Sequence, residues 1–256
     1  MTDAMGLLSV VEEALWLGFL VFLRVAATVS LLPAFGEQSV PMRVKLVLAL
    51  AFTAIVAPAV NITLPGVTVT SLALFALTET IYGVMLGLGL RLFILALQTA
   101  GAIAAQSTSL SQIMGGAAVE PLPAMGYILT VGALALAALS GLHIKAAEFM
   151  ILSYDILPIG LFAGGHDMAQ WGVAQISRAF SLAFVLAAPF VLMSVLYNLT
   201  LGVINKAMPQ LMVAFVGAPV ITLGGLFILF LAAPSMLAVW LGALDRFMAA
   251  PFEIAP

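Results

Sequence analysis

Long, nearly uncharged apolar segments dominate this sequence of 256 residues and limit what it can fold into. Hydrophobic residues make up 64% of the chain and charged residues only 7%, whereas a soluble domain has about 45–50% apolar and about 25% charged residues. So few charged side chains cannot cover the surface of a soluble protein of this size. The sequence therefore predicts an integral membrane protein.

The apolar segments have the length of membrane helices and leave no room for a separate soluble domain. A helix needs about 20 apolar residues to cross the hydrocarbon core, so the chain allows about six to eight crossings. The segments are continuous, without the alternation of a β-barrel. We expect an all-α integral membrane protein of about six to eight broken or kinked helices in hairpins, forming a single membrane domain over residues 1–256. The segments are Ala14–Leu32, Leu46–Val60, Val67–Ala105, Met125–Leu142, Ala146–Phe162, Ala179–Ile204 and Leu211–Leu244.

Several segments are expected to be broken helices. Residues 67–105 are too many for one straight crossing and predict two helices or one broken helix. Each proline removes a backbone donor and tends to kink or break a helix, and broken helices are tolerated where they face protein or water. This pattern favours a chain packed inside other protein over a simple bundle with kinks. The prolines are Pro33, Pro58, Pro189, Pro219 and Pro234.

Charge and residue usage exclude several functional classes. The net charge is −3 with 8 Lys and Arg residues, so the basic patch of a nucleic-acid binder is missing. The chain has no cysteine, which removes thiolate metal sites, disulfides and thiol catalysis. His143 and His166 do not have metal-ligand spacing, and no defensible arrangement of Ser, His and Asp emerges. We therefore expect no enzyme, no catalytic residues, no cofactor and no metal.

Basic residues in loops indicate the orientation. The N-terminal segment is acidic and has no Lys or Arg before Arg24, whereas the loop over residues 36–45 carries Arg43 and Lys45. Because short cytoplasmic loops carry an excess of Lys and Arg, the N-terminus is predicted outside the cytoplasm and this loop inside.

Three charged residues lie inside apolar segments and are expected to be buried: Arg24, Glu79 and Arg91. Each would cost about 2.5–3.5 kcal/mol at the centre of a lipid-facing helix, so they should face protein, water or each other. Glu79 and Arg91 would lie about 18 Å apart along one helix and cannot pair there. Their partners should come from elsewhere, either in this chain or in another one; snorkelling at a membrane edge is the alternative for Arg24 and Arg91.

Glycines on the same segment predict close packing. Gly83-x-x-x-Gly87, with Gly89 and Gly101 further along, permits two helices to approach closely. The pattern indicates tight packing without identifying the partner.

Two polar stretches interrupt the apolar pattern. Residues 106–123 have too few charges for a solvated loop and too little apolar length for a crossing, which suits a flexible element in a narrow water-filled passage; a surface connection is the alternative. Asn198, Gly202 and Asn205 are spaced i, i+4, i+7 and share one helix face. Polar amides in membrane helices hydrogen-bond across helices or line water.

Short segments, in order from about residue 15 to 245, resemble the flagellar biosynthetic protein FliR family. The motif Asn205-Lys206-x-x-Pro209-Gln210-Leu211 is the most specific of them. Two positions depart from the family pattern: Ala102 stands in place of an acidic residue and Met212 in place of an Asn. The segments are Phe22–Ala26, Pro33–Gly36, Ser39–Lys45, Gly83–Arg91, Gln98–Gly101, Leu157–Gly160, Asn198–Gly202, Asn205–Leu211 and Gly217–Pro219.

The resemblance implies a subunit of the type III secretion export gate in the bacterial flagellar basal body. In this family FliR joins FliP and FliQ in a helical assembly around a channel for unfolded flagellar proteins, with FlhB and FlhA as further partners. It implies a FliP-like part over residues 14–163 and a FliQ-like helical hairpin over residues 179–245. The assembly lies in the inner membrane, raised toward the periplasm, so that its helices need not all cross lipid.

The resemblance also implies site residues by position. The channel plug matches the loop over residues 106–123, with Gln106, Ser109, Gln112, Ile113, Met114, Gly115, Gly116 and Glu120. The lumenal core matches Asn198, Gly202, Asn205, Lys206, Pro209 and Gln210.

Two other classes compete with this interpretation. A proton- or ion-coupled small-molecule transporter would use broken helices at a midplane site; Glu79, Arg91 and the prolines support it, but the sequence has no matching inverted halves. A membrane assembly factor without a lumen is the third class. The motifs favour flagellar over injectisome use.

Overall fold

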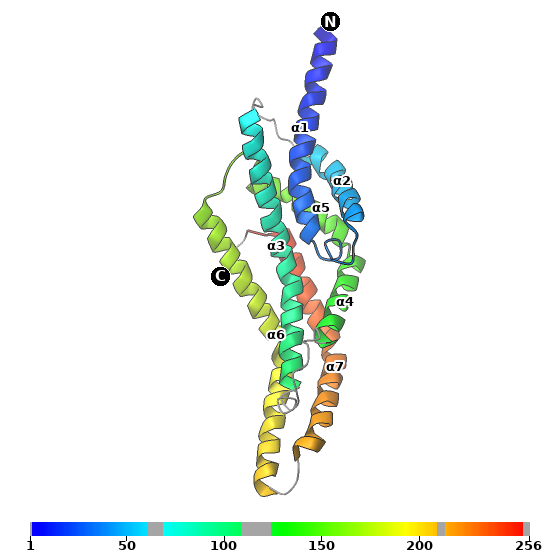
Figure 1. Cartoon of the computed structure of the whole chain (residues 1–256), viewed down its shortest axis with the longest axis vertical. Helices are drawn as coiled ribbons and strands as arrows, with labels where there is room; N and C mark the ends of the chain where they lie inside the picture. The colour runs from blue at the N-terminus through cyan, green and yellow to red at the C-terminus, as the bar shows by residue number, and fades with distance from the viewer. Residues whose placement is uncertain (1, 61–68, 109–123, 209–212, 253–256) are drawn as a thin grey trace. The chain divides into compact units, whose positions relative to one another are not determined.

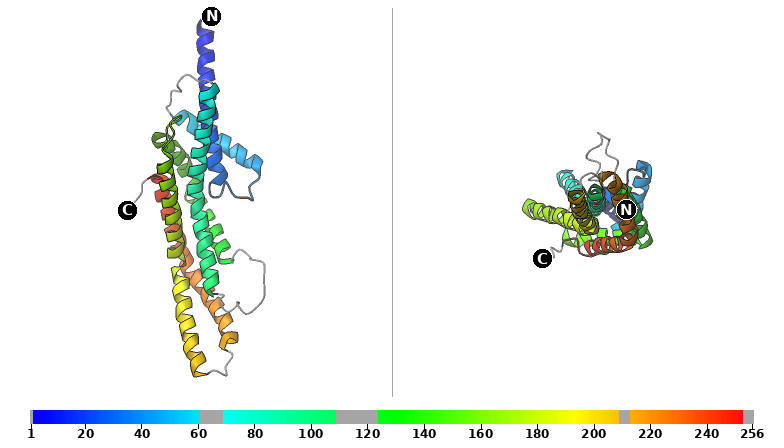
Figure 2. Two further views of the ribbon diagram at one scale, coloured as in Figure 1. Left: turned by 60° about the vertical axis from the view of Figure 1, so that its left-hand side comes forward. Right: turned by 90° about the horizontal axis from the view of Figure 1, so that it is seen from below.

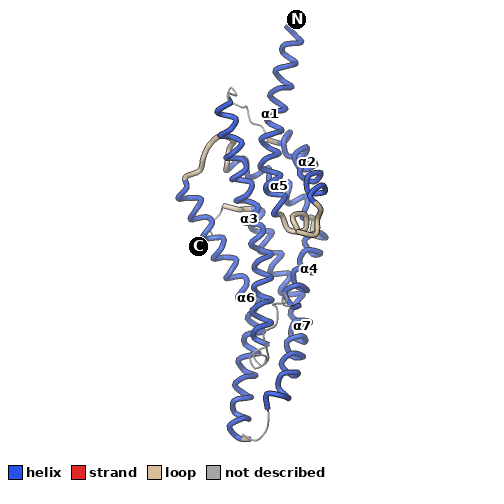
Figure 3. Tube along the Cα trace, viewed as in Figure 1, coloured by secondary structure: helices blue, strands red, loops and turns tan. Residues whose placement is uncertain are grey.

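The described part of the chain is built from helices joined by loops. The computed structural model describes residues 2–60, 69–108, 124–208 and 213–252, and none of these ranges contains a strand (Figure 3). This confirms the prediction of an all-α protein. The seven helices are α1 (Thr2–Leu31), α2 (Met42–Ala59), α3 (Val69–Thr108), α4 (Ala124–Leu139), α5 (Leu142–Ile156), α6 (Gly165–Ala207) and α7 (Val213–Ala249) (Figure 1).

Most of these helices are suited to a membrane. Five are long and apolar enough to cross one, and the pair α4 and α5, bent by 77° at its junction, is a sixth candidate. The apolar part of α3 has 37 residues and α6 has 43, which correspond to about 55 and 65 Å at 1.5 Å per residue. Both exceed the hydrocarbon core of about 30 Å. The chain is thus an integral membrane protein whose longest helices reach beyond one crossing.

The helices divide into two compact units. Unit 1 holds residues 1–92, 138–175 and 245–256, and unit 2 holds residues 93–137 and 176–244. Unit 1 therefore contains α1, α2, α5, the first half of α3 and short ends of α6 and α7. The division into a FliP-like part and a FliQ-like hairpin stays a prediction.

In unit 1, glycines bring α3 close against α1. A Cβ atom added to Gly83 would overlap the carbonyl oxygen of Arg24, and one added to Gly87 would lie 2.9 Å from the Cβ of Leu31. The hydroxyl of Thr28 donates a hydrogen bond to the Gly83 carbonyl at 3.1 Å. Since the contacts advance together along both helices, α1 and α3 run parallel. The close packing predicted from the Gly83-x-x-x-Gly87 pattern is confirmed, and its partner is α1.

The predicted break within residues 67–105 is wrong, because α3 is one helix of 40 residues. The segment contains no proline, and a helical glycine costs only about 1 kcal/mol, which packing at these glycines can offset. The prolines differ in effect. Pro33 and Pro58 lie at helix ends, since α1 ends at Leu31 and α2 at Ala59, whereas α6 continues through Pro189 and α7 through Pro219 and Pro234. Neighbouring helices and local adjustments can satisfy the backbone groups that a proline frees.

Aromatic side chains attach the end of α7 to the rest of unit 1. The ring of Phe247 lies 5.8 Å from that of Phe149 in α5 and 6.4 Å from that of Trp171 in α6. The indole nitrogen of Trp171 donates a hydrogen bond to the carbonyl of Pro251 at 2.8 Å. Gly89 on α3 leaves the space for these rings, since a Cβ there would lie 2.7 Å from Phe247.

In unit 2, α6 and α7 form an antiparallel hairpin and run side by side (Figures 1 and 2). The hydroxyl of Tyr197 donates to the carbonyl of Gly217 at 2.7 Å. The Met193 side chain, four residues before Tyr197 on α6, lies next to Gly224, seven residues after Gly217 on α7. The contacts thus move backward along α6 as they move forward along α7, as expected for antiparallel helices.

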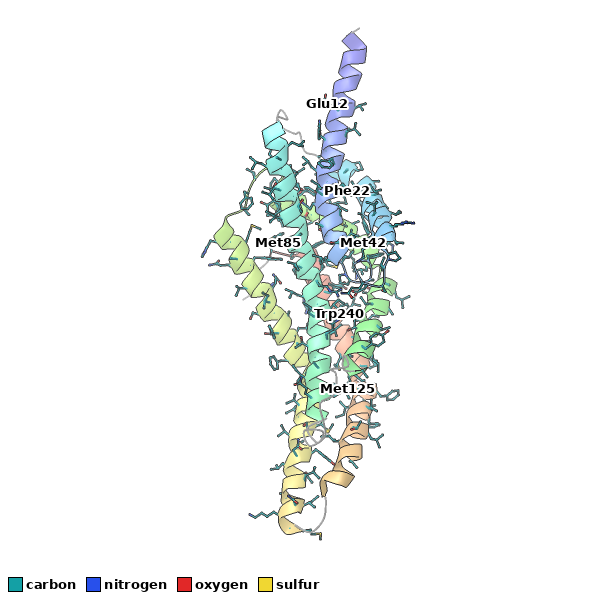
Figure 4. The ribbon with its side chains drawn as sticks, viewed as in Figure 1. Glu12, Phe22, Met42, Met85, Met125 and Trp240 are labelled. Carbon is teal, nitrogen blue, oxygen red and sulfur yellow. The ribbon has the colours of Figure 1, made fainter. Side chains whose placement is uncertain are left out.

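The same unit packs α3 and α4 against this hairpin. Gly101 of α3 and Gly126 of α4 are in direct backbone contact, since a Cβ atom on Gly101 would overlap Gly126. Trp240 of α7, labelled in Figure 4, is completely buried, and its indole nitrogen donates to the carbonyl of Phe93 at 2.9 Å. These contacts form the core of unit 2.

Candidate functional site

The most strongly bonded polar cluster is buried in unit 1 and centres on Arg24. Its guanidinium holds the Glu79 carboxylate with two hydrogen bonds, from Nε at 2.8 Å and from Nη2 at 2.9 Å. Neither side chain has any exposed surface. This forked geometry is the strong form of an ion pair, because two parallel charge-assisted bonds fix the two groups together.

The backbone of α5 and the loop after it satisfy the rest of the guanidinium. Nη1 donates to the carbonyl and the hydroxyl of Ser153, both at 3.2 Å, and Nη2 donates to the carbonyl of Leu157 at 2.7 Å. Arginine has five N–H donors, so all of them are used. The ring of Tyr154 lies 3.8 Å and that of Tyr82 lies 5.2 Å from the guanidinium carbon, which adds cation–π attraction.

Arg24 and Glu79 therefore find their partners within this chain, so another chain is not needed to pair them. Arg24 and Glu79 lie on different helices of the same chain, and the glycine contacts between α1 and α3 bring them together. The prediction that such charges face protein or each other agrees with this geometry. The cluster joins α1, α3 and α5, and it leaves no donor on Arg24 for a ligand.

Arg91 has a different partner and is not fully buried. Its Nη1 donates to Glu37 Oε1 at 2.6 Å, and 24% of the Arg91 side chain and 20% of the Glu37 side chain remain exposed. Glu37 lies in the loop between α1 and α2, where Lys45 Nζ also donates to the Gly36 carbonyl at 2.9 Å. The pair anchors this loop on α3. Sequence reasoning missed Glu37, since it lies in a polar loop, and its partner Arg91 is 54 residues away in the sequence.

The described residues of the predicted lumenal core form a polar stripe on an open face of α6. Asn198, Gly202, Asn205 and Lys206 are all exposed. A Cβ atom placed on Gly202 would meet no described atom within 4 Å outside the adjoining turns of α6. Pro209 and Gln210 lie outside the described residues. The stripe therefore presents two amides and a bare backbone position on a helix whose other exposed side chains are largely apolar.

A chain of hydrogen bonds connects this stripe to the end of α3. Asn198 Nδ2 donates to the hydroxyl of Ser194 at 3.2 Å, and that hydroxyl donates to the carbonyl of Ser107 at 2.6 Å. Both serines are buried. Sequence reasoning missed Ser194, although it lies four residues before Asn198 and so extends the same stripe by one helical turn.

The predicted plug over residues 106–123 begins inside α3, because the helix continues to Thr108 instead of ending at residue 105. Gln106 is therefore helical, and it is exposed. Ser109, Gln112, Ile113, Met114, Gly115, Gly116 and Glu120 lie outside the described residues. Among the residues that the structure describes, no group of three His, Cys, Asp or Glu side chains could hold a metal ion.

Comparisons with known proteins agree on one family. The model of the family "bacterial export proteins, family 1" matches residues 15–247. The chain is 33% identical over 225 residues to the flagellar biosynthetic protein FliR of Caulobacter vibrioides, covering 86% of this chain and 90% of that protein. It is 31% identical over 216 residues to FliR of Escherichia coli, covering 80% of each. With FliR of Aquifex aeolicus it shares 31% identity over 230 residues, covering 87% of each chain.

Proposed function

The chain belongs to the FliR family of flagellar export proteins, and we propose that it forms and closes the type III export channel together with FliP and FliQ homologues. As a family member it is a component of the flagellar export apparatus, and its apolar helices give it a membrane location. Under the proposal, unfolded flagellar proteins pass through a channel to which the polar face of α6 contributes.

One observation carries this proposal: the hydrogen-bonded chain from Asn198 through Ser194 to Ser107. The exposed amide of Asn198 lies on the face that would border the channel. The Ser107 carbonyl lies at the upstream end of the proposed plug segment, residues 106–123. A polar lining and the start of a closing element are thus joined by two hydrogen bonds.

The plug segment has the residues that a soft seal requires. Gly115 and Gly116 give the backbone conformational freedom, and Met114 can fill an irregular gap because its side chain is unbranched. Pro121 and Pro123 restrict the downstream end by fixing φ. With Ser107 held by Ser194 upstream, the segment would close the channel between substrates and move aside for one.

The proposed location is the bacterial inner membrane within the flagellar basal body, raised toward the periplasm, with FlhB and FlhA as further partners. The apolar part of α3, 37 residues, and α6, 43 residues, support this placement, because both are longer than a lipid crossing needs. We place the N-terminus on the periplasmic side and the loop before α2 in the cytoplasm. Arg43 lies in the first turn of α2, directly after this loop, and is exposed, as the excess of basic residues near cytoplasmic loops favours.

The buried charges argue against the alternative of a proton- or ion-coupled transporter. A transporter needs charged groups that can exchange a proton, ion or substrate, but Arg24 and Glu79 satisfy each other and the backbone of α5. Purification in mild detergent separates the two functions. The export-gate proposal requires FliP and FliQ homologues to co-purify, whereas a transporter would run alone or as a small oligomer.

Ion permeability of cells that express the whole complex tests the closing function. Deleting residues 109–119 should leave the complex assembled but leaky. Ser194→Ala, which removes the hydrogen bond to Ser107, should leak to a smaller extent. Ser235→Ala is the matched control, because the Ser235 hydroxyl donates to the carbonyl of Ala232 in the same helix, and this variant should stay as tight as the wild type.

The deletion result decides the proposal. If the deleted complex assembles and its permeability is unchanged, the seal lies elsewhere, and a function for residues 109–123 in closing is refuted. If the complex stays tight and a leak appears only with Ser235→Ala, the assignment of α6 to the channel is refuted as well.

A further inference from the structure

A groove in unit 1 takes no part in the function described above. Its volume is about 560 Å³, and it lies between α5 and the last turns of α7. Four apolar residues line it, Ile151 and Leu152 from α5 and Met248 and Ala249 from α7. The groove is therefore a concave apolar surface built from two helices whose ends the aromatic contacts of Phe247 hold together.

Charged residues border this apolar lining. Lys145 Nζ lies 2.7 Å from Asp245 Oδ1, so these two charges balance each other at one end. Glu148 and Asp155 also line the groove, and both are exposed. Neither makes an ion pair with any residue that the structure describes. The groove thus carries two unbalanced negative charges.

The two free carboxylates have a defined spacing on α5. Glu148 and Asp155 are seven residues apart, which places them on one side of the helix and about 10 Å apart along its axis. Ile151 and Leu152 lie between them. The pattern along the groove is therefore acidic, apolar, acidic over two helical turns.

Lipid does not suit this surface. An unpaired carboxylate is costly in hydrocarbon, and anionic headgroups repel it. The groove must face water or protein.

We propose that the groove is a docking site for a helical segment of a partner protein that carries Lys or Arg residues seven apart around an apolar side chain. The apolar side chain would fill the space over Leu152 and Met248, and the two cations would meet Glu148 and Asp155. Opposite charges placed this way steer the encounter and fix the register of the bound helix.

The occupant is a different protein, not a segment of this chain or a second copy. The Lys and Arg residues of this sequence are at positions 24, 43, 45, 91, 145, 178, 206 and 246. No two of them are seven residues apart, so no helix of this chain can match the two carboxylates.

Site-specific photo-crosslinking in cells that contain the whole export apparatus tests the proposal. The photoreactive residue replaces Ala249, which is exposed and lines the groove, and the crosslinked peptide is sequenced by mass spectrometry. The expected adduct is a protein segment with two basic residues seven apart around an apolar one. Replacing both carboxylates by lysine (Glu148→Lys with Asp155→Lys) should lower the adduct about tenfold, because two attractive contacts become repulsive.

Two further variants make the result specific. Glu12→Lys changes an exposed acid on α1 (Figure 4) and should leave the adduct unchanged. Exchanging the two basic residues of the partner segment for Glu should restore the adduct in the lysine variant. If the lysine variant does not accumulate, Glu148→Gln with Asp155→Asn removes the same charges with little change of shape and should also reduce the adduct.

The proposal is overturned by any of the remaining outcomes. These are no adduct, an adduct with lipid, an adduct with a neutral or acidic segment, or an adduct whose yield does not depend on the charges at positions 148 and 155.

Discussion

Replacing Glu79 by glutamine keeps the shape of the side chain but leaves the charge of Arg24 without a counterion. The wild-type carboxylate accepts two hydrogen bonds from Arg24, at 2.8 and 2.9 Å, in a site with no exposed surface. An amide offers one oxygen and turns an N–H group toward the second donor. Removing one partner of a buried pair costs about 3–5 kcal/mol. At about 1.4 kcal/mol per factor of ten, the folding equilibrium falls by two to nearly four orders of magnitude.

This loss is large against the total stability of a protein, which is about 5–15 kcal/mol. We therefore expect Glu79→Gln to lower sharply both the amount of protein in the membrane and the temperature at which the detergent-purified complex aggregates. Glu37→Gln is the matched control, because the Arg91–Glu37 pair is partly exposed and such a pair contributes about 1 kcal/mol or less. The assay measures both quantities for the two variants beside the wild type.

A double variant separates the charge from the packing. Arg24→Met with Glu79→Leu removes both charges and keeps apolar volume, and such replacements are often neutral or stabilising. It should therefore recover much of the stability that Glu79→Gln loses. Wild-type stability of Glu79→Gln would show that water or another chain reaches Arg24. A double variant no better than the single one would refute the argument from the buried pair.

Three further substitutions test the packing of the helices and the proposed channel face. Gly83→Leu should destabilise the chain by more than about 1–3 kcal/mol, the usual cost of overpacking, because a Cβ atom at this position meets the backbone of α1. Gly18→Ala is its control, since a Cβ atom there meets nothing within 4 Å, and it should be neutral or stabilising by up to about 1 kcal/mol. The thermal aggregation temperature of the two variants measures both effects. Gly202→Leu should leave the isolated chain as stable as the wild type but prevent co-purification of FliP and FliQ homologues. The control Leu201→Met should still co-purify with them. If cells that carry Gly202→Leu swim normally, the assignment of this face is wrong. Trp171→Phe loses the hydrogen bond to the carbonyl of Pro251 and should reduce the stability of the chain by about 1 kcal/mol, which would lower its aggregation temperature. An unchanged aggregation temperature would mean that the aromatic contacts alone hold the end of α7.

The sequence predicts the helical class and most helix positions because an apolar run of membrane length is a local signal. Prediction from the sequence fails where the structure of an apolar segment depends on the helices that pack against it. The segment of α3 looked too long for one helix, yet Gly83, Gly87 and Gly101 each contact a neighbouring helix, and those contacts support one continuous helix. The prolines at 189 and 234 likewise leave α6 and α7 unbroken for reasons that only the neighbours supply.

The same distinction applies to the candidate site. The shared face of Asn198, Gly202 and Asn205 follows from helical spacing and is seen on α6. The partner of Arg24 is 55 residues away in the sequence and that of Ser194 is 87 away. Helical periodicity relates residues within one helix and says nothing of such distances, so these pairs could not be predicted from spacing.

The distances along the chain between Arg24 and its acceptors also set an order of events during synthesis. Glu79 is made 55 residues after Arg24, and the carbonyl of Leu157 is made 133 residues after it. At about 5–20 residues per second, α1 waits roughly 3–11 s for its counterion and roughly 7–27 s for its last acceptor. Throughout this interval a helix with a lone guanidinium must stay in contact with water, at the membrane surface or within the insertion machinery, and not in lipid. Stable burial of α1 is thus delayed until α3 and α5 have followed, and a ribosome that stops before Glu79 leaves Arg24 without its counterion.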